Sequence, residues 1–204
     1  MPAPNALSLI KQWLSSLGVR QAPAKAERVI TPVTDALDQR ILNDYTGQDL
    51  SQTLNRHLTG RTAPIQRYED SYGIPADEIV RRLQAMTQES SEFKGPVFSG
   101  IRSPRYMEML RGSDELPVFM SSSPTLRGGG DYMWDGMAVF KRPGKAINPE
   151  AYQRFSDEAG SELILPKGRK LQLLDQTTVR EGKSDLPVLL FEKEGGLVAL
   201  KGKK

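Results

Sequence analysis

The sequence of 204 residues contains no cysteine and a single histidine. The absence of cysteine excludes disulfide bonds, zinc-thiolate sites and cysteine nucleophiles. With only His57, sites built from several histidines are excluded and a Ser-His-Asp triad is disfavoured. His57 lies in TLNRHLTG, where leucines at 50, 54 and 58 recur at helical spacing. We therefore expect it on a helix surface rather than in a catalytic site, and we predict no metal site.

The sequence also lacks a long apolar run. No stretch approaches the ~20 apolar residues that a transmembrane helix needs. The opening MPAPNALSLIKQWLSSLG has no charged residue before its short apolar face and no cleavage site after it, so we do not expect a signal peptide. The net charge of +3 is mild and owes part of its sign to the tail LKGKK. Without aromatic residues interleaved among the basic ones, this tail does not indicate nucleic-acid binding.

An apolar content of 38% and a charged content of 26% are typical of a soluble globular protein. Residues 6–17 predict an amphipathic helix, and VRQAPAKAERVITP after it predicts a linker. We therefore divide the chain into an N-terminal arm, residues 1–33, and a main domain, residues 34–204. The apolar face of the arm has two interpretations: it packs on its own domain, which ordinary burial favours, or it contacts a protein partner.

The main domain predicts helices first and strands second. Helices are expected over 34–45 and 49–58 and from near Pro75 onwards, with a further helix in SPRYMEMLRG. Short strands are expected over 95–103, 116–123, 136–143, 162–166, 170–176, 186–194 and 196–201, the last two pairing as a hairpin. This order predicts an α+β fold with a helical N-terminal half and a mixed or antiparallel two-sheet core.

Four stretches, in order, resemble the NAD-dependent mono-ADP-ribosyltransferases of the bacterial-toxin and phage type. ILNDYTGQDLSQTLNRHLTG resembles the segment in which a Tyr-Thr-Gly turn precedes a helix with Asn and Leu. SEFKGPVFSGI resembles the first core strand, which usually carries an aromatic residue, arginine and glycine. LPVFMSSS resembles the Phe-Met-Ser-Thr-Ser strand, and GSELILPKGRKLQLL the Glu-x-Glu strand. The resemblance covers residues 35–194 and concerns the fold first, since one fold serves many functions.

The resemblance implies two facing sheets that hold NAD in a cleft, and cleavage of the bond between nicotinamide and ribose. The last glutamate of the family motif falls on Glu162, directly before LILP, which implies that Glu162 is the catalytic carboxylate. The serine strand falls on Ser121, Ser122 and Ser123, implying contacts to NAD and to the glutamate. Read from the residues alone, the same features are a strand-edge glutamate and a polar strand end before a turn.

Two positions depart from the family pattern. Ser99 stands where arginine is expected, and serine cannot make the bidentate charged contact with phosphate oxygens. Arg102, Arg105 and Arg127 are the candidate replacements. Strand alternation sends Arg102 to the face opposite Ser99, so it serves only with a bulge or with NAD placed differently. Gly160 stands where the family has the acceptor-directed glutamate or glutamine, and Glu158, two residues earlier, is the candidate substitute.

The loop TLRGGGDYMWDG, which contains Arg127, has two interpretations of its own. Its glycines, Tyr132 and Trp134 make either a mobile aromatic lid or an ordinary surface loop with a buried tryptophan. We favour the second.

Two functional hypotheses follow. The first, slightly favoured, is a non-catalytic or weakly active binding or assembly module with an ADP-ribosyltransferase fold, for example a phage virion component or an effector, because a catalytic site needs its groups as a unit. The second is an active NAD-dependent mono-ADP-ribosyltransferase with atypical phosphate and acceptor contacts. Both predict a protein partner, and they place the chain in the cytoplasm or on a virion.

Overall fold

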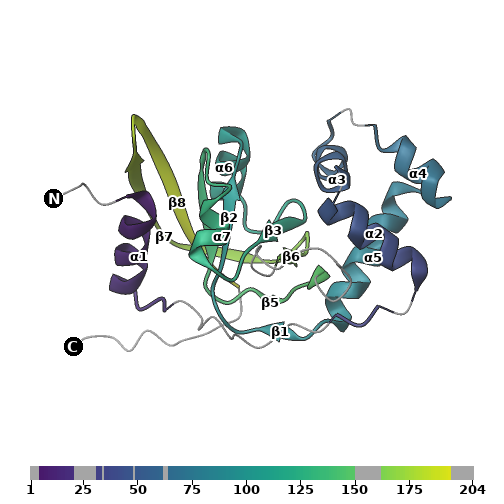
Figure 1. Cartoon of the computed structure of the whole chain (residues 1–204), viewed down its shortest axis with the longest axis horizontal. Coiled ribbons are helices and arrows are strands. Elements are labelled where there is room, and N and C mark those ends of the chain that lie inside the picture. Colours follow the sequence, from purple (N-terminus) through teal and green to yellow (C-terminus); the bar gives the residue numbers. More distant parts are fainter. Residues whose placement is uncertain are drawn as a thin grey trace.

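The computed structural model describes residues 5–20, 31–33, 35–47, 49–61, 64–149 and 162–193. The helices are α1 (Ala6–Ser16), α2 (Ala36–Gly47), α3 (Leu50–Leu58), α4 (Gln66–Tyr72), α5 (Ala76–Glu89), α6 (Pro104–Arg111) and α7 (Leu126–Gly130). The strands are β1 (Glu92–Phe93), β2 (Val97–Ile101), β3 (Met120–Ser122), β4 (Gly136–Phe140), β5 (Gly144–Lys145), β6 (Leu163–Leu165), β7 (Leu171–Glu181) and β8 (Ser184–Lys193). Helices α2–α5 gather at one end of the molecule and the strands fill its middle (Figure 1).

The main sheet has the strand order β2-β4-β8-β7, with β4 and β8 parallel and the other neighbours antiparallel. Strands β3 and β6 form a separate antiparallel pair, and β1 pairs with β5. One isolated bridge, between Phe98 of β2 and Ser123 after β3, connects the main sheet to the β3–β6 pair. Here the two backbones exchange hydrogen bonds of 2.8 Å in each direction. This bridge fixes the register of β2 against β3.

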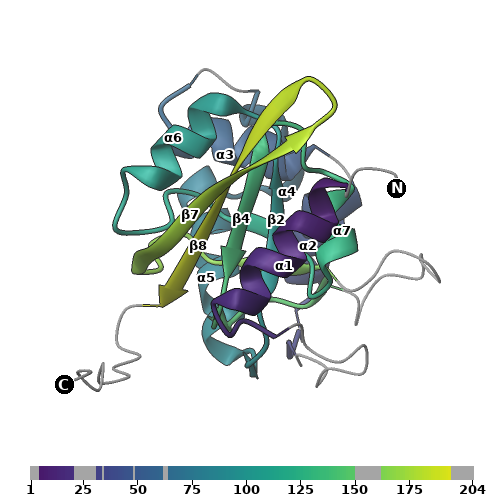
Figure 2. The same cartoon turned by 90° about the vertical axis from the view of Figure 1, so that its left-hand side faces the viewer.

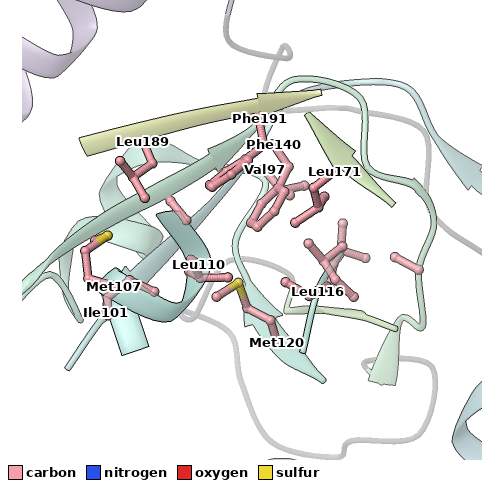
Figure 3. Close-up of a cluster of buried hydrophobic side chains, with 14 of the residues drawn as sticks. Val97, Ile101, Met107, Leu110, Leu116, Met120, Phe140, Leu171, Leu189 and Phe191 are labelled. Carbon is pink, nitrogen blue, oxygen red and sulfur yellow. The ribbon is translucent and has the colours of Figure 1, made fainter. Parts of the chain in front are cut away.

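One face of the main sheet packs against α6 and the inward face of β3 and β6. The side chains of this cluster interdigitate between the strands and α6 (Figure 3). They include Val97, Ile101, Met107, Leu110, Met120, Phe140, Leu163, Leu165, Leu189 and Phe191. Helix α6 begins at an ordinary cap: the Ser103 hydroxyl accepts from the Tyr106 amide, and Pro104 occupies the first turn.

The opposite face of the main sheet is covered by α1 and α7 (Figure 2). Ala6, Ile10 and Leu14 of α1 are buried in one cluster with residues of β4, β7 and β8. The apolar face of the predicted N-terminal helix therefore packs on the protein's own core, as the favoured interpretation expected. The division at residues 33 and 34 and a partner contact through this helix stay predictions.

Helices α2–α5 pack around a third cluster, which also takes in Phe119, Ile147 and Ile164 from the strand region. The outer surface of this unit carries an ion-pair network centred on Arg82, whose guanidinium contacts Asp38 at 2.7 Å and Asp35 at 3.0 Å. A backbone amide hydrogen bond from Leu37 and the Arg82 guanidinium hold the pKa of Asp35 below its usual range. The buried side chains of Phe119 and Ile164, rather than these ion pairs, join the helical half to the β3–β6 pair.

The structure agrees with the predicted α+β order and differs in detail. The strand predicted over 170–176 extends to Glu181 and forms a long hairpin with β8 across Gly182, whose φ of 61° suits glycine. The hairpin predicted between 186–194 and 196–201 reaches outside the described residues. Helices α4 and α7 and strands β1 and β5 were not predicted. Within the described ranges, no helix has the length and apolar character that crossing a membrane requires.

Candidate functional site

Alternation along β2, β3 and β6 separates the candidate residues onto two faces. Ser122 lies opposite Leu163, and both face the α6 cluster. Ser121 lies opposite Ile164, which packs in the helical cluster instead. Glu162 precedes Ile164 by two residues and so shares the face of Ser121. The side chains of Ser121 and Glu162 are therefore brought together on the side that looks toward α2 and α3.

The three consecutive serines have three different environments. Ser121 is exposed on the face just described, whereas Ser122 and Ser123 are buried. The Ser122 hydroxyl forms a hydrogen bond of 2.5 Å with the Ser99 hydroxyl. The Ser123 hydroxyl accepts from the Thr125 amide at 3.1 Å and holds the turn that leads into α7. Of the predicted serines, Ser121 alone is accessible to a ligand.

Tyr45, near the C-terminal end of α2, lies beneath Ser121 and Glu162 and was not among the predicted site residues. Its side chain is buried in the helical cluster. Among the described residues, its hydroxyl has no partner in hydrogen-bonding geometry. Burial raises the pKa of the Tyr45 phenol above its ordinary value, and the negative charge of Glu162 raises it further, while Ser121 and Asn55 act in the opposite direction. The Tyr45 side chain is therefore a neutral phenol, and Glu162 lies close enough for its charge to raise the pKa of that phenol.

Asn55 of α3 ties the helical half to the serine strand. Its Nδ2 donates to the carbonyl oxygen of Phe119 at 2.9 Å, two residues before Ser121. Its Oδ1 is buried and has no hydrogen-bond partner among the described residues. The region beside Ser121 and Glu162 therefore contains two buried polar atoms, the Tyr45 hydroxyl and the Asn55 Oδ1, whose hydrogen-bonding capacity is unused. The Tyr-Thr-Gly and Asn signals of the sequence could have identified both residues.

Ser99 is a core residue rather than a cleft residue. Only 1% of it is exposed, and its bond to Ser122 places it on the face of the α6 cluster. The register of β2 against β4 is regular through Ser99 and Gly100, so no bulge turns Ser99 toward Ser121. Position 99, where the family resemblance leads us to expect a phosphate-binding arginine, therefore faces away from Glu162.

Arg102 belongs to the other face of β2. Gly100, two residues earlier, lies directly under the backbone of Tyr132, and a side chain at Gly100 would collide with it. The Arg102 guanidinium also contacts Tyr132, so Arg102 and Gly100 share a side. Because the Phe98–Ser123 bridge joins β2 and β3 antiparallel, this is the face of Ser121. Regular alternation, and not a bulge, thus places Arg102 on the candidate face.

In the loop after α7, the two aromatic side chains are exposed, whereas Met133 between them is buried. Trp134 is 66% exposed and Tyr132 54%, so the expectation of a buried tryptophan is wrong. The backbone beneath these rings is fixed to β2: the Asp135 amide donates to the carbonyl oxygen of Ile101 at 2.8 Å. Arg127 of α7 is also exposed.

The acceptor-side candidates Gly160 and Glu158 lie outside the described residues, so their roles stay predictions. Among the described residues, no group of three or more histidine, aspartate or glutamate side chains could hold a metal ion. What the structure brings together is one carboxylate, Glu162, one exposed hydroxyl, Ser121, and the buried side chains of Tyr45 and Asn55.

Comparison with known proteins gives matches in structure only. No family model matches the sequence, and neither does any curated protein. Exoenzyme S of Pseudomonas aeruginosa, solved with human 14-3-3 protein beta and carba-NAD, superposes with a TM-score of 0.58 at 15% identity, over 83% of this chain and 79% of that one. The catalytic domain of VahC from Aeromonas hydrophila gives 0.55 at 14% identity, over 79% and 100%.

The Vis toxin, an ADP-ribosyltransferase from Vibrio splendidus, gives a TM-score of 0.53 at 12% identity, over 98% of this chain and 92% of that one. At such identities the likeness establishes the fold alone. The chain has an ADP-ribosyltransferase-like α+β fold, which confirms the fold expected from the four sequence stretches.

Proposed function

We propose that this protein binds NAD beside Ser121 and Glu162 and transfers ADP-ribose to an acceptor. The observation that carries the proposal is the placement of Glu162 on the Ser121 face, above the buried Tyr45 hydroxyl. The accessible groups fit a ribose, since the Glu162 carboxylate and the exposed Ser121 hydroxyl offer hydrogen bonds of the kind that a sugar makes. Exoenzyme S, which shares the fold, has been solved with carba-NAD, and this supports NAD as the ligand class.

NAD would supply the ribose whose bond to nicotinamide breaks, a reaction in which positive charge develops on the sugar. Glu162 would stabilise that charge, because a fixed carboxylate in a partly desolvated site acts more strongly than in water. Ser121 would orient the carboxylate and the ribose by hydrogen bonds. Tyr45 is neutral near pH 7, as a phenol ordinarily is, and its raised pKa keeps it so at higher pH, so it adds no competing negative charge.

A second candidate function is a non-catalytic binding or assembly module with this fold. The observation that favours it is Ser99: the position expected to carry a phosphate-binding arginine is instead a buried serine on the opposite face. Gly160 offers no acceptor-directed side chain, which favours it as well. A virion or effector setting belongs to this candidate and stays a prediction.

Labelling with radioactive NAD separates the two candidates. Wild-type protein, Glu162→Gln and the control Glu181→Gln, an exposed glutamate on β7, are incubated with labelled NAD and a host lysate, and NAD binding is measured by calorimetry. Transferase activity predicts labelling by wild type and control and a loss of about 100-fold in Glu162→Gln. If none of the three proteins labels a target and none shows heat of NAD binding, the proposed transferase activity is rejected in favour of the binding module.

A further inference from the structure

A cation and two aromatic rings form a stack at the surface where β2 ends. The guanidinium carbon of Arg102 lies 4.6 Å from the ring centroid of Tyr132 and 4.6 Å from that of Trp134. Both rings are largely exposed, at 54% and 66%, although soluble proteins generally bury side chains of this size. We name Arg102, Tyr132 and Trp134 the aromatic platform.

Close contacts with β2 fix the backbone of the loop that carries Tyr132 and Trp134. A Cβ at Gly100 would lie 2.6 Å from the Tyr132 carbonyl oxygen and 2.5 Å from that of Gly129, so only glycine allows the loop to lie this close to β2. The Asp135 amide closes the loop on the other side by donating to Ile101. The two rings are therefore presented from a backbone fixed on both sides, which lowers the entropy cost of binding.

Arg102 differs in its charge balance from four other arginines of the described residues. Arg67, Arg81, Arg82 and Arg111 each pair with a carboxylate. Arg102 makes no ion pair with a carboxylate in the part of the chain that the structure describes, and Asp131 and Asp135 of the adjacent loop do not reach it. A contact with a ring face uses the charge of the cation and leaves its N–H groups available. The guanidinium can therefore receive a carboxylate through two parallel hydrogen bonds.

We propose that the aromatic platform is a docking site for an acidic segment of a partner protein. Trp, Tyr and Arg are the residue types that dominate binding energy at protein interfaces. The rings offer apolar area. The Arg102 guanidinium, which pairs with no carboxylate among the described residues, supplies the complementary charge. By alternation from the Phe98–Ser123 bridge, the platform lies on the side of β2 that corresponds to Ser121 on β3. If the proposed function holds, the docked protein is the acceptor, but the docking itself does not depend on it.

The test uses a fluorescent short peptide of alternating glutamate and leucine and a matched peptide with glutamine in place of glutamate. Binding to the full chain is followed by anisotropy. The variants are Arg102→Gln and Trp134→Ala, with Arg180→Gln and Leu174→Ala as controls, which remove an exposed arginine and an exposed apolar side chain of β7. We expect the glutamate peptide to bind at least about tenfold more tightly, Arg102→Gln and Trp134→Ala each to weaken it at least about tenfold, and the controls to stay within about twofold.

Two results would overturn the proposal. The first is equal binding of the glutamate peptide to wild type and Arg102→Gln, with both folded by circular dichroism. The second is displacement of the peptide by NAD together with loss of NAD affinity in Arg102→Gln, which would assign the guanidinium to a nucleotide. Glu162→Gln should retain peptide binding, so a failure of the proposed transferase activity leaves this result readable.

Discussion

The buried hydroxyl pair of Ser99 and Ser122 gives the sharpest prediction about the register that separates the two faces. Their oxygens are 2.5 Å apart, and the two residues are 1% and 5% exposed. Replacing either serine by alanine leaves the other hydroxyl buried without its partner, at a cost of about 1–3 kcal/mol. The double replacement removes both polar groups and should cost much less than the sum of the two single changes, because no unsatisfied group remains.

The assay is urea unfolding followed by circular dichroism, with thermal melting as a second measurement. For a chain of this size each kcal/mol corresponds to about 2–4 °C, so a loss of about 2 kcal/mol lowers Tm by about 4–8 °C. Ser184→Ala, on the exposed surface of β8, is the matched control and should change stability by less than about 0.5 kcal/mol. Additive single changes, or single changes as small as the control, would refute the pairing.

The same pair predicts the result of restoring an arginine at position 99. Ser99→Arg would place a guanidinium on the face of the α6 cluster, beside Val97 and Ile101, without a partner. We expect a loss of at least about 3 kcal/mol in the free energy of unfolding and no gain in NAD affinity. A Ser99→Arg variant that melts like wild type and binds NAD more tightly would contradict the assignment of Ser99 to the core.

Three further predictions concern other parts of the fold. Gly100→Ala should cost about 1–3 kcal/mol, because its Cβ would meet the loop backbone, whereas Gly112→Ala, whose Cβ would lie 3.6 Å from the nearest atom, should be tolerated; equal effects in urea unfolding would show that the loop is not packed on β2. Because the folded pKa of Asp35 is depressed, the Arg82 pair stabilises the protein above the unfolded pKa of that carboxyl and loses its effect as the pH falls through the folded value. The Tm difference between wild type and Arg82→Gln should therefore shrink from about pH 6 to about pH 3, and a constant difference would contradict the assignment. Tyr45→Phe should leave the free energy of unfolding unchanged or up to about 1 kcal/mol higher, since it removes a buried hydroxyl without a partner; a clear loss would show that the hydroxyl is bonded in the folded state.

Much of the architecture could be predicted because its signals are local. Apolar residues at helical spacing identified α2, α3 and α5, and apolar segments between Gly, Pro and Ser identified β2, β3, β4 and β6. The length of β7 was underestimated, because its second half, DQTTVRE, is polar and exposed on one side and lacks the apolar character used to find strands. Its extent depends on pairing with β8, a contact that no local pattern contains.

The sequence predicted candidate residues for the site, but not the faces of the strands on which they lie. Alternation along β2 correctly separated Ser99 from Arg102, yet nothing local decides which of the two faces Ser121. The bridge between Phe98 and Ser123 makes that choice, and it joins two strands far apart in sequence. Tyr45 was not among the predicted site residues although the Tyr-Thr-Gly resemblance contains it, because the position of its hydroxyl under Glu162 depends on the packing of α2 on the β3–β6 pair.

The central claim, that Glu162 and Ser121 form an NAD-cleaving site, is tested most directly by nicotinamide release from NAD with purified protein and no added acceptor. Water can then take the place of the acceptor, so neither Gly160 nor the partner protein enters the measurement. We predict release above the buffer rate for wild type and a rate about 100-fold lower for Glu162→Gln. Release at equal rates by the two proteins, or no release by wild type, would contradict the claim.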